Sequence, residues 1–565
     1  MSISVRRRLG WVLAGAMLLA VAAAGAQTLP RLVKLTSSGY VIGYVSEDDP
    51  TVRVFLGVPY AEPPVGDLRF RPPRPATPPE VPIDALFEPP SCMQSPYREG
   101  GFYAQPLEEV SEDCLYVNLW TAAESDSDRL PVMVWIHGGA LTRGSGSLPL
   151  YDGTALARKG VVVVTVNYRL GPFGYLAHPA LSAESDQGTS GNYGVLDQVL
   201  ALQWVRDNIA TFGGDPDRVT IFGESAGSWS VNVLQASPLA RGLFHRVIGQ
   251  SGGHFAGLPE LRSPGDGSAE SAGEAFVKRL GIEGAGEGAA AGLRELDAET
   301  ILAEASKQGA FATRPNVDGW VLPKQVAEIY RAGEQADVPV LVGSNRDEAT
   351  SLMGRMLPST KSAVEFLVKS QFADVADEFF EAYPVPTDDD ARRAFIDAFS
   401  DRIFAWQMKT WAVLSETVSS PAYLYFFTHA PPHPEKEFYG AYHAAEIAYA
   451  FDNLDKLDYE YAEEDRELAD AMSGYWVAFA STGDPNLPGT CAAETGCAGL
   501  LAGIRREAAA SGSSAAPSGS GLPAWPEFKP ETARHLEFGS TIEVGSHLHR
   551  DRMALWDRFF EVTQP

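Results

Sequence analysis

The heptapeptide Ile221-Phe222-Gly223-Glu224-Ser225-Ala226-Gly227 fits the pattern G-x-S-x-G, in which a serine lies on a sharp turn between a strand and a helix. Residues 219–222 are predicted as a short buried strand, and residues 228–234 can continue as a helix. The two glycines suit such a turn, because the chain is strained and passes close to itself there. A plain turn is the alternative, but the flanking strand and helix favour an exposed Ser225 hydroxyl at the end of a strand.

Other apolar runs indicate a mostly parallel sheet that is wrapped by helices. Runs that are apolar on both faces are typical of central parallel strands, and here they alternate with segments of helical spacing. Residues 31–60 are β-rich, the proline-rich stretch 57–66 is expected to be irregular, and residues 258–310 and 361–415 are expected to be helical. The other predicted strands are 115–120, 131–136, 161–166, 244–250, 338–343 and 422–427, and the other predicted helices are 196–209 and 463–480.

The chain has 565 residues, which is long for one domain, although a parallel sheet with large insertions can reach this length. We expect a single domain over residues 27–565, interrupted at about 488–522 by a flexible insertion rich in Ala, Gly and Ser. A formal net charge of −28 argues against a nucleic-acid partner, which requires a basic surface. The same charge weakly favours neutral or cationic substrates over anionic ones.

Residues 1–26 have the three parts of a secretory signal peptide. Three arginines at 6–8 precede an uncharged run rich in Ala, Leu and Val, which ends in Ala24-Gly25-Ala26 before Gln27. A membrane anchor is the alternative, but the run is short and rich in small residues, so we expect cleavage and no stable membrane anchor. The protein is therefore predicted to be periplasmic or secreted, and the arginine triplet leaves a twin-arginine export route open.

The four cysteines suggest two disulfides in an exported chain, with three possible connectivities. Cys92 and Cys114 would close a loop of about twenty residues, worth roughly 3 kcal/mol in the loop-entropy model. We interpret this segment, which contains Phe102 and Tyr103, as a surface loop. Cys491 and Cys497 lie close together in the sequence and are expected to pair with each other. Four free thiols are the alternative, which export disfavours.

A serine nucleophile needs a base to take its proton and an acid to orient that base. After this type of turn, the acid and then the histidine follow the serine along the chain. Asp347 and Glu348 follow the predicted strand 338–343, and both are candidates for the acid. His443 lies in a turn that leads into a helix, which makes it a candidate for the base. The histidines beyond the acids are His429, His433, His443, His535, His547 and His549.

Further motifs make the chain resemble the type-B carboxylesterases, the family of the bacterial para-nitrobenzyl esterases and the cholinesterases. The resemblance implies an α/β-hydrolase fold, with a large, mostly parallel sheet and helical insertions, and activity on carboxylic esters. The matches are Gly57-Val58-Pro59-Tyr60-Ala61, Leu68-Arg69-Phe70, Ser111-Glu112-Asp113-Cys114-Leu115-Tyr116, Trp135-Ile136-His137-Gly138-Gly139, Asn167-Tyr168-Arg169-Leu170-Gly171, Phe212-Gly213-Gly214-Asp215-Pro216, Gly223 to Gly227, Gln250-Ser251-Gly252, Arg346-Asp347-Glu348 and His443-x-x-Glu446-Ile447.

The resemblance assigns roles to particular residues. It implies that Ser225 is the nucleophile, Glu348 the orienting acid and His443 the base, with Asp347 as a structural neighbour and possible helix cap. It also implies an oxyanion hole at the loop Gly138-Gly139-Ala140, where the N–H groups of Gly139 and Ala140 join that of Ala226. Family members often have a third glycine at position 140, so the alanine methyl group is expected to take room in the pocket.

Two neighbours of the predicted triad and two charged pairs are further candidates. Glu224 and Ser251 match positions beside the catalytic residues, where they either pack or tune His443. The resemblance implies two structural ion pairs, Arg69 with Glu112 and Arg169 with Asp197. The first disulfide also matches the family, whereas Cys491 and Cys497 lie in an insertion that the resemblance does not cover.

No phosphate loop, dinucleotide fingerprint or metal-ligand cluster competes with this interpretation. The spaced pair His547 and His549 lacks a nearby Cys or acidic cluster, so metal binding there is a minor alternative. The sequence therefore predicts an exported serine carboxylesterase that acts on small-molecule esters without a cofactor or metal. A non-catalytic binding protein on the same scaffold is the rival, which the filled triad positions disfavour. The Cys92–Cys114 segment has no tryptophan, so choline esters are not favoured.

Overall fold

We describe a computed structural model of the chain over residues 32–96, 102–103, 109–264, 267–307, 314–486 and 522–563. The predicted signal peptide, Cys491, Cys497 and nearly all of the predicted insertion lie outside these ranges. Within them, none of the helices has the length and apolar character needed to cross a bilayer.

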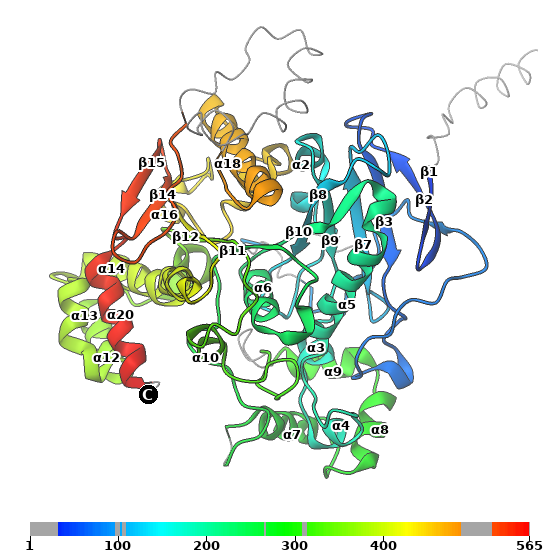
Figure 1. The fold of residues 1–565 in the computed structure, drawn as a ribbon. Helices are drawn as coiled ribbons and strands as arrows, with labels where there is room; N and C mark the ends of the chain where they lie inside the picture. The colour runs from blue at the N-terminus through cyan, green and yellow to red at the C-terminus, as the bar shows by residue number, and fades with distance from the viewer. Residues whose placement is uncertain are drawn as a thin grey trace, which may run out of the picture.

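A large mixed sheet forms the centre of the molecule (Figure 1). Its strands follow the order β1-β2-β3-β7-β9-β8-β10-β11-β12-β13-β14-β15, and β4 pairs with β2. The run from β9 through β8 to β14 is parallel, and antiparallel pairs flank it at both ends. The strands are β1 Leu32–Thr36, β2 Gly39–Val45, β3 Arg53–Pro59, β4 Ile83–Asp84, β7 Tyr116–Thr121, β8 Leu130–Ile136, β9 Val162–Val166, β10 Gly214–Glu224, β11 Arg246–Gln250, β12 Val340–Asn345, β13 Ala422–Phe427, β14 Arg534–Phe538 and β15 Ile542–Ser546.

Alternate residues of the central strands belong to two different apolar layers. In β8, Val132, Val134 and Ile136 pack into one hydrophobic cluster, whereas Met133 and Trp135 pack into the other. Because successive side chains of a strand point to opposite faces, both faces of this strand are buried. This double burial explains why the central strands read as continuous apolar runs in the sequence.

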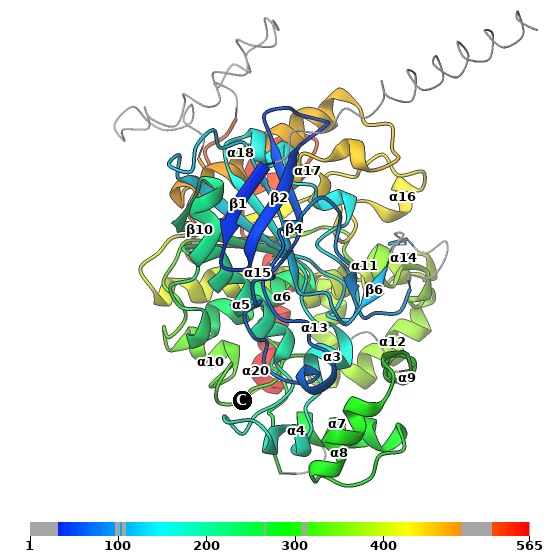
Figure 2. The same ribbon diagram turned by 90° about the vertical axis from the view of Figure 1, so that its right-hand side faces the viewer.

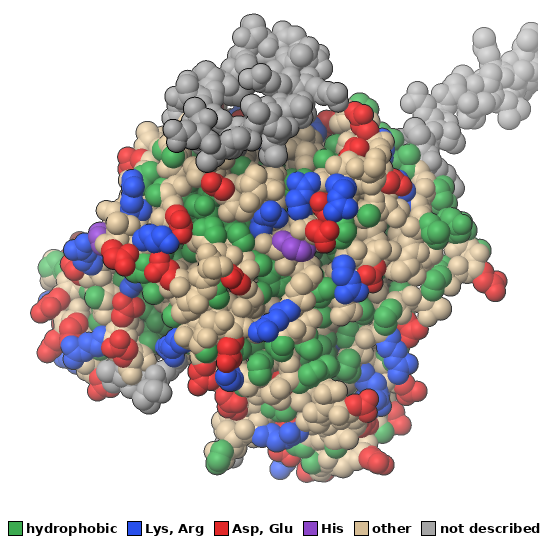
Figure 3. Space-filling view, viewed as in Figure 1, with side chains coloured by type: hydrophobic (Ala, Val, Ile, Leu, Met, Phe, Trp, Pro, Cys, Tyr) green, Lys and Arg blue, Asp and Glu red, His purple; other side chains and the backbone are tan. Residues whose placement is uncertain are grey.

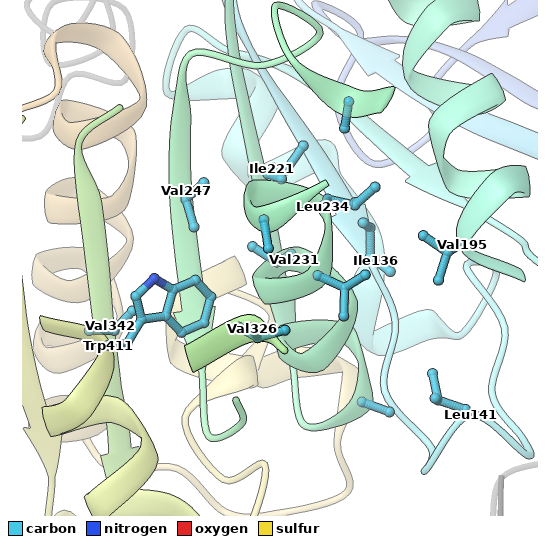
Figure 4. Packing of buried hydrophobic residues seen from close by; sticks show 14 of the residues in the cluster. Ile136, Leu141, Val195, Ile221, Val231, Leu234, Val247, Val326, Val342 and Trp411 are labelled. Atoms are coloured by element: carbon cyan, nitrogen blue, oxygen red, sulfur yellow. The ribbon is translucent and has the colours of Figure 1, made fainter. Parts of the chain in front are cut away.

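Helices cover the two faces. One face packs against α5 Tyr193–Asn208, α6 Ala226–Ala236, α10 Val326–Arg331 and α15 Trp406–Leu414, and the other packs against α17 Ile447–Phe451 and α18 Glu463–Thr482. Figure 4 shows the first layer, where Val231 and Leu234 of α6 lie among Ile136, Ile221 and Val247 from the strands. The helix that follows Ser225 is therefore held by apolar contacts with the sheet.

The remaining helices lie further from the sheet. In Figures 1 and 2, α7, α8 and α4 lie together at the bottom, where with α9 they form a helical lobe, and in Figure 1 the group that contains α12, α13 and α20 lies apart, on the left. The bounds are α2 Thr154–Arg158, α3 Gly171–Tyr175, α4 Pro179–Ala183, α7 Ala269–Arg279, α8 Glu287–Glu295, α9 Ala298–Ala305, α11 Ala349–Leu352, α12 Lys361–Gln371, α13 Ala376–Ala382, α14 Asp388–Ser400, α16 Lys436–Tyr439 and α20 Arg550–Thr563.

The prediction for residues 57–66 was wrong at its start, because β3 continues through Pro59. The pairing of β3 with β7 shifts register between Phe55 and Val58, and Gly57 takes a positive φ of 72° inside this irregular step. A bulge absorbs the extra residue and lets pairing resume at Val58. Pro59 is the last residue of the strand, where its missing N–H has the least effect on the ladder.

Candidate active site

Ser225 lies on the turn between β10 and α6, as the sequence predicts. Its backbone has φ 55° and ψ −121°, a conformation that an L-residue rarely adopts, and two backbone hydrogen bonds hold it. The Ser225 N–H donates to the carbonyl oxygen of Gln250 at 2.8 Å, and the Trp229 N–H donates to the Ser225 carbonyl at 2.9 Å. A Cβ atom at Gly227 would lie 1.9 Å from the carbonyl oxygen of Ile136, so the close approach requires glycine.

His443 is oriented by Glu348, across the gap between the loops that follow β12 and β13. The Nδ1 atom of His443 lies 2.5 Å from Oε2 of Glu348, and both side chains are buried. The other carboxylate oxygen accepts hydrogen bonds from the Ser251 hydroxyl at 2.6 Å and from the Asn345 N–H at 2.8 Å. Both oxygens of Glu348 are therefore used, which fixes the carboxylate relative to the imidazole.

The second ring nitrogen of His443 faces Glu224. Its Nε2 atom lies 3.1 Å from Oε1 of Glu224, and the ring packs against Phe404, whose centroid is 4.8 Å away. Phe404 comes from a π-helical turn at Asp401–Ala405. Among the described residues, the Ser225 hydroxyl makes no hydrogen bond to His443. The structure thus places His443 in direct contact with Glu348 and 3.1 Å from Glu224, the residue that precedes Ser225.

Three buried carboxyl groups surround this imidazole and set its proton affinity. Burial on its own lowers the pKa of His443, but the charges of Glu224 and Glu348 outweigh it and raise the pKa to about 9. Burial raises the pKa of Glu224 well above its usual value, and the nearby carboxylates Glu446 and Glu348 raise it further. The two groups therefore titrate as a coupled pair, although Oε1 of Glu224 makes no hydrogen bond within the described residues.

Glu446 belongs to the same network, although the sequence analysis assigned it no role beyond its place in a motif. Gln250 donates to Oε1 of Glu446 at 3.0 Å, and Asn345 donates to its Oε2 at 2.6 Å. Trp476 of α18 donates in turn to the amide oxygen of Gln250 at 3.1 Å. The spacing of three residues from His443 was the one available signal, because it placed both side chains on a single turn.

The glycine loop after β8 lies against the nucleophile. A Cβ atom at Gly138 would lie 2.8 Å from the Glu224 carbonyl oxygen and 3.1 Å from the Cβ of Ser225. Gly139 has a φ of 106°, and Ala140 has a φ of 55°, which is uncommon for a residue with a side chain. The loop thus lies beside Ser225, and its role as an oxyanion hole stays a prediction. Ala226 is the first residue of α6, where backbone N–H groups have no partner within the helix.

Asp347 lies beside the acid but does not cap α11, so the cap hypothesis was wrong. Its carboxylate accepts hydrogen bonds from the Ala441 N–H at 2.9 Å, from Arg346 at 2.9 Å and from Arg393 at 2.7 Å. A Cβ atom at Gly440 would lie 2.2 Å from this carboxylate, which explains the glycine there. Asp347 therefore fixes the turn that leads to His443.

The segment between Cys92 and Cys114 is more than a surface loop. The predicted disulfide between these cysteines is present, with their Cα atoms 5.0 Å apart. Within the segment, the Tyr103 hydroxyl donates to the carbonyl oxygen of His443 at 2.9 Å and lies 2.5 Å from the Ser351 hydroxyl. Nothing in the sequence identified this contact, because it joins positions more than three hundred residues apart.

The two predicted ion pairs are confirmed, and both are bidentate. Arg69 binds Glu112 with its Nε at 2.6 Å, and Arg169 binds Asp197 with its Nε at 2.8 Å. His549, one of the two histidines considered for metal binding, instead lies 2.9 Å from Asp401. Across the described ranges, no group of three or more His, Cys, Asp or Glu side chains could hold a metal ion.

Comparison with known proteins agrees with this architecture. A model of the carboxylesterase family matches residues 30–556. Fumonisin B1 esterase from Sphingopyxis macrogoltabida is 38% identical over 474 residues, covering 81% of this chain and 83% of that protein. Para-nitrobenzyl esterase from Bacillus subtilis is 37% identical over 455 residues, covering 77% of this chain and 87% of that protein.

A solved structure of a PNB esterase superposes with a TM-score of 0.74 at 32% identity, covering 93% of this chain and 99% of that one. The matching fold and the matching length leave no large part of either chain without a counterpart. The relatives are esterases by name, which implies small-molecule ester substrates. The chain therefore belongs to the carboxylesterase family, has the α/β-hydrolase fold and is a carboxylic ester hydrolase.

Proposed function

We propose that Ser225, His443 and Glu348 form a catalytic triad that hydrolyses carboxylic esters through an acyl-enzyme. The hydrogen bond of 2.5 Å between His443 and the fully engaged carboxylate of Glu348 is the main support. The second support is the strained turn at Ser225, which directly follows Glu224, the residue that faces Nε2 of His443. A rigid acid that orients a histidine near a serine on a sharp turn is the arrangement that serine hydrolysis needs.

In the acylation step, Ser225 Oγ attacks the ester carbonyl carbon while His443 Nε2 accepts the hydroxyl proton. The carbonyl oxygen becomes an oxyanion, for which the N–H groups of Gly139, Ala140 and Ala226 are the proposed donors. When the carbonyl re-forms, the bond to the alcohol oxygen breaks and the alcohol takes the proton from His443. A water molecule then repeats both steps on the acyl-enzyme and releases the acid. Because Nε2 also contacts Glu224, it must exchange that contact for the serine hydroxyl.

The triad is tested with Ser225→Ala, because the turn tolerates the smaller side chain. Turnover of p-nitrophenyl butyrate should fall to the background rate while the melting temperature stays within a few degrees. Ser481→Ala is a matched control, since its buried hydroxyl donates only to the Val477 carbonyl within α18. A fluorophosphonate probe should label the peptide that contains Ser225 in the unaltered protein. Labelling elsewhere, or full turnover in Ser225→Ala, contradicts the proposal.

We also propose that the protein is exported and that its signal peptide is removed. The arginine triplet, the apolar run and the small residues before Gln27 support this, as does the disulfide between Cys92 and Cys114, a bond typical of oxidising compartments. The native protein should begin at or near Gln27, and denaturation should expose no alkylatable thiol. Retention of Met1, or four alkylated cysteines, contradicts export.

A further inference from the structure

One long helix is interrupted at the point where it passes His443. The π-helical turn Asp401–Ala405 joins α14 directly to α15, without a loop between them. Within this turn, the Trp406 N–H donates to the carbonyl oxygen of Asp401, five residues back in the chain instead of four. Such turns are rare inside α-helices and recur at functional sites, so we looked for the contacts outside the helix that favour this one.

The π turn contacts both the proposed base and the chain next to its acid. The ring of Phe404 is buried, and its centroid lies 4.8 Å from that of the His443 ring. Ser400, the residue before the turn, accepts the Ala349 N–H with its hydroxyl oxygen at 3.1 Å. Because Ala349 directly follows Glu348, a shift of the π turn would disturb both partners of the imidazole–carboxylate contact.

Asp401, the first residue of the turn, is buried and is held by groups from other elements. The Tyr383 hydroxyl donates to its Oδ2 atom at 2.8 Å, and Nδ1 of His549 lies 2.9 Å from its Oδ1 atom. Nη1 of Arg552 lies 3.4 Å from Oδ2. His549 and Arg552 lie at the start of α20, the C-terminal helix, which Figure 1 shows beside α14. Asp401 therefore ties the π turn to the C-terminal segment.

A second line of charges runs from Arg552 to the other side of the imidazole. Arg552 binds Asp397 of α14 at 3.2 Å, and Arg393, one helical turn earlier, binds Asp397 as well. Arg393 also binds Asp347 at 2.7 Å, and Asp347 accepts the Ala441 N–H in the turn that leads to the imidazole. The signs alternate along this line, so each inner charge has an opposite charge on both sides.

Two acids of these lines differ from the charges on the molecular surface. Figure 3 shows acidic and basic side chains interspersed over the part of the molecule where Figure 1 shows α12, α13 and α20. Solvent screens ion pairs of that kind, and most of them contribute little. In contrast, the side chains of Asp347 and Asp401 are only 2% and 4% exposed. Removing a partner from a buried carboxylate leaves a charge that water cannot fully compensate.

We propose that Asp401, His549 and Arg552 are positioning residues for the reaction: they fix the π turn, so that Phe404 keeps the His443 ring aligned with Glu348. The proposal rests on the function proposed for Ser225. A misplacement of about 1 Å, caused far from the chemistry, can cost about 100-fold in rate. Because none of the three residues carries out the proposed proton transfers, we expect their loss to lower kcat and to leave KM for a neutral ester unchanged.

The first experiment compares two arginines of α20. Arg552→Gln should lower kcat for p-nitrophenyl butyrate roughly fivefold at constant KM, because it removes a cation from both lines of charges. Arg558→Gln is the matched control, since Arg558 pairs with Glu378 of α13 at 2.6 Å and should leave kcat unchanged. An unchanged kcat in Arg552→Gln, or an equal fall in both variants, overturns the inference.

The second experiment asks whether Asp401 acts through Phe404. Asp401→Asn should lower kcat roughly tenfold in the unaltered protein, but less than threefold when Phe404 is already leucine, because the aromatic ring to be positioned is gone. A general loss of rigidity would lower kcat by the same factor in both backgrounds, and that result overturns the inference. Urea unfolding reports the stability of each variant. If Asp401→Asn does not fold, the same cycle is measured with His549→Ala.

A conservative change at His549 gives a further check. His549→Asn keeps a nitrogen donor near the place of Nδ1, so it should retain most of the kcat that His549→Ala loses. Equal losses in these two variants contradict a role for the contact with Asp401. The proposed function is judged separately: it stands if the unaltered protein hydrolyses p-nitrophenyl butyrate and Ser225→Ala does not, whatever the cycle shows. If Ser225→Ala keeps full turnover, the triad proposal fails, and this inference fails with it.

Discussion

The network around His443 and an open cavity of about 820 Å³ at the helical lobe are built in different ways. The network is buried and rich in carboxyl groups: hydrogen bonds hold Glu348 and Glu446, whereas Glu224 faces the imidazole without a hydrogen bond among the described residues. The cavity is open, and its described lining comes from separate loops and helix faces, among them Ala256–Pro259 and α7. No member of the network belongs to the described lining of the cavity, so we expect changes in that lining to leave the network undisturbed.

The largest effect is expected for Glu348→Gln, which removes the carboxylate that contacts His443 Nδ1. The amide keeps the shape of the carboxylate, but it cannot accept at both ends and cannot stabilise a protonated His443. By analogy with acid-to-amide changes in other triads, kcat should fall about 10³- to 10⁴-fold. Steady-state kinetics on a p-nitrophenyl ester, with circular dichroism to confirm folding, measures this.

Asp347→Asn is the matched control for that change, since it alters the adjacent acid in the same way. Asp347 holds the turn at Ala441 and binds Arg393, but it does not contact His443, so kcat should fall less than tenfold. If Asp347→Asn were the more damaging of the two, the assignment of Glu348 as the orienting acid would be wrong.

The next effect concerns Ala140, in the glycine loop that lies against Ser225. Its methyl group is predicted to narrow the space for a tertiary alcohol, a conflict typically worth 1–3 kcal/mol, or about 10- to 200-fold. Tert-butyl acetate should therefore be hydrolysed much more slowly than ethyl acetate, and Ala140→Gly should raise the ratio of the two rates. The φ of 55° also suits glycine, so the change should not strain the loop. An unchanged ratio means that the methyl group faces away from the alcohol.

Much of the network could be predicted because each member belongs to a short motif. Ser225 is marked by its glycines and by the flanking strand and helix, and the order of serine, acid and histidine narrowed the search for the partners. The contacts of Asp347 and Tyr103 were missed for the opposite reason. Their partners, Arg393 and the His443 carbonyl, lie on elements that only the folded chain brings together. Local sequence carries no signal for such pairs.

The strands of the fold were likewise predictable only where the signal is local in the sequence. Strands that are buried on both faces, such as β8 and β13, were predicted within about two residues, because an uninterrupted apolar run has few other interpretations. The end of β3 was missed because a bulge at Gly57 allows a proline-rich segment to stay paired for two more residues. The lining of the cavity was not predictable at all, since it comes from segments that are far apart in the sequence and carry no motif.

A smaller effect concerns the electrostatic coupling of Glu224 and His443. Only the neutral imidazole can accept the serine proton, so kcat/KM should rise with pH through the raised pKa of about 9. Glu224→Gln removes the strongest of the charges that raise this pKa, so the midpoint should move down towards the ordinary value of about 6.5. Rates measured from pH 5 to 10, less the Ser225→Ala background, give both midpoints. Equal midpoints would show that Glu224 does not set the proton affinity of His443.

The smallest effect tests whether the disulfide-closed segment contributes to the rigidity of the network. Tyr103→Phe removes a hydroxyl that donates to the His443 carbonyl, a hydrogen bond worth about 1 kcal/mol, so kcat should fall roughly fivefold while KM for a neutral ester stays the same. Tyr475→Phe is the control, because it removes a hydroxyl that donates to another backbone carbonyl, that of Pro523. Both variants should lose similar stability in urea unfolding, but only Tyr103→Phe should lose kcat. If the two lose kcat equally, Tyr103 supports the fold and does not position His443.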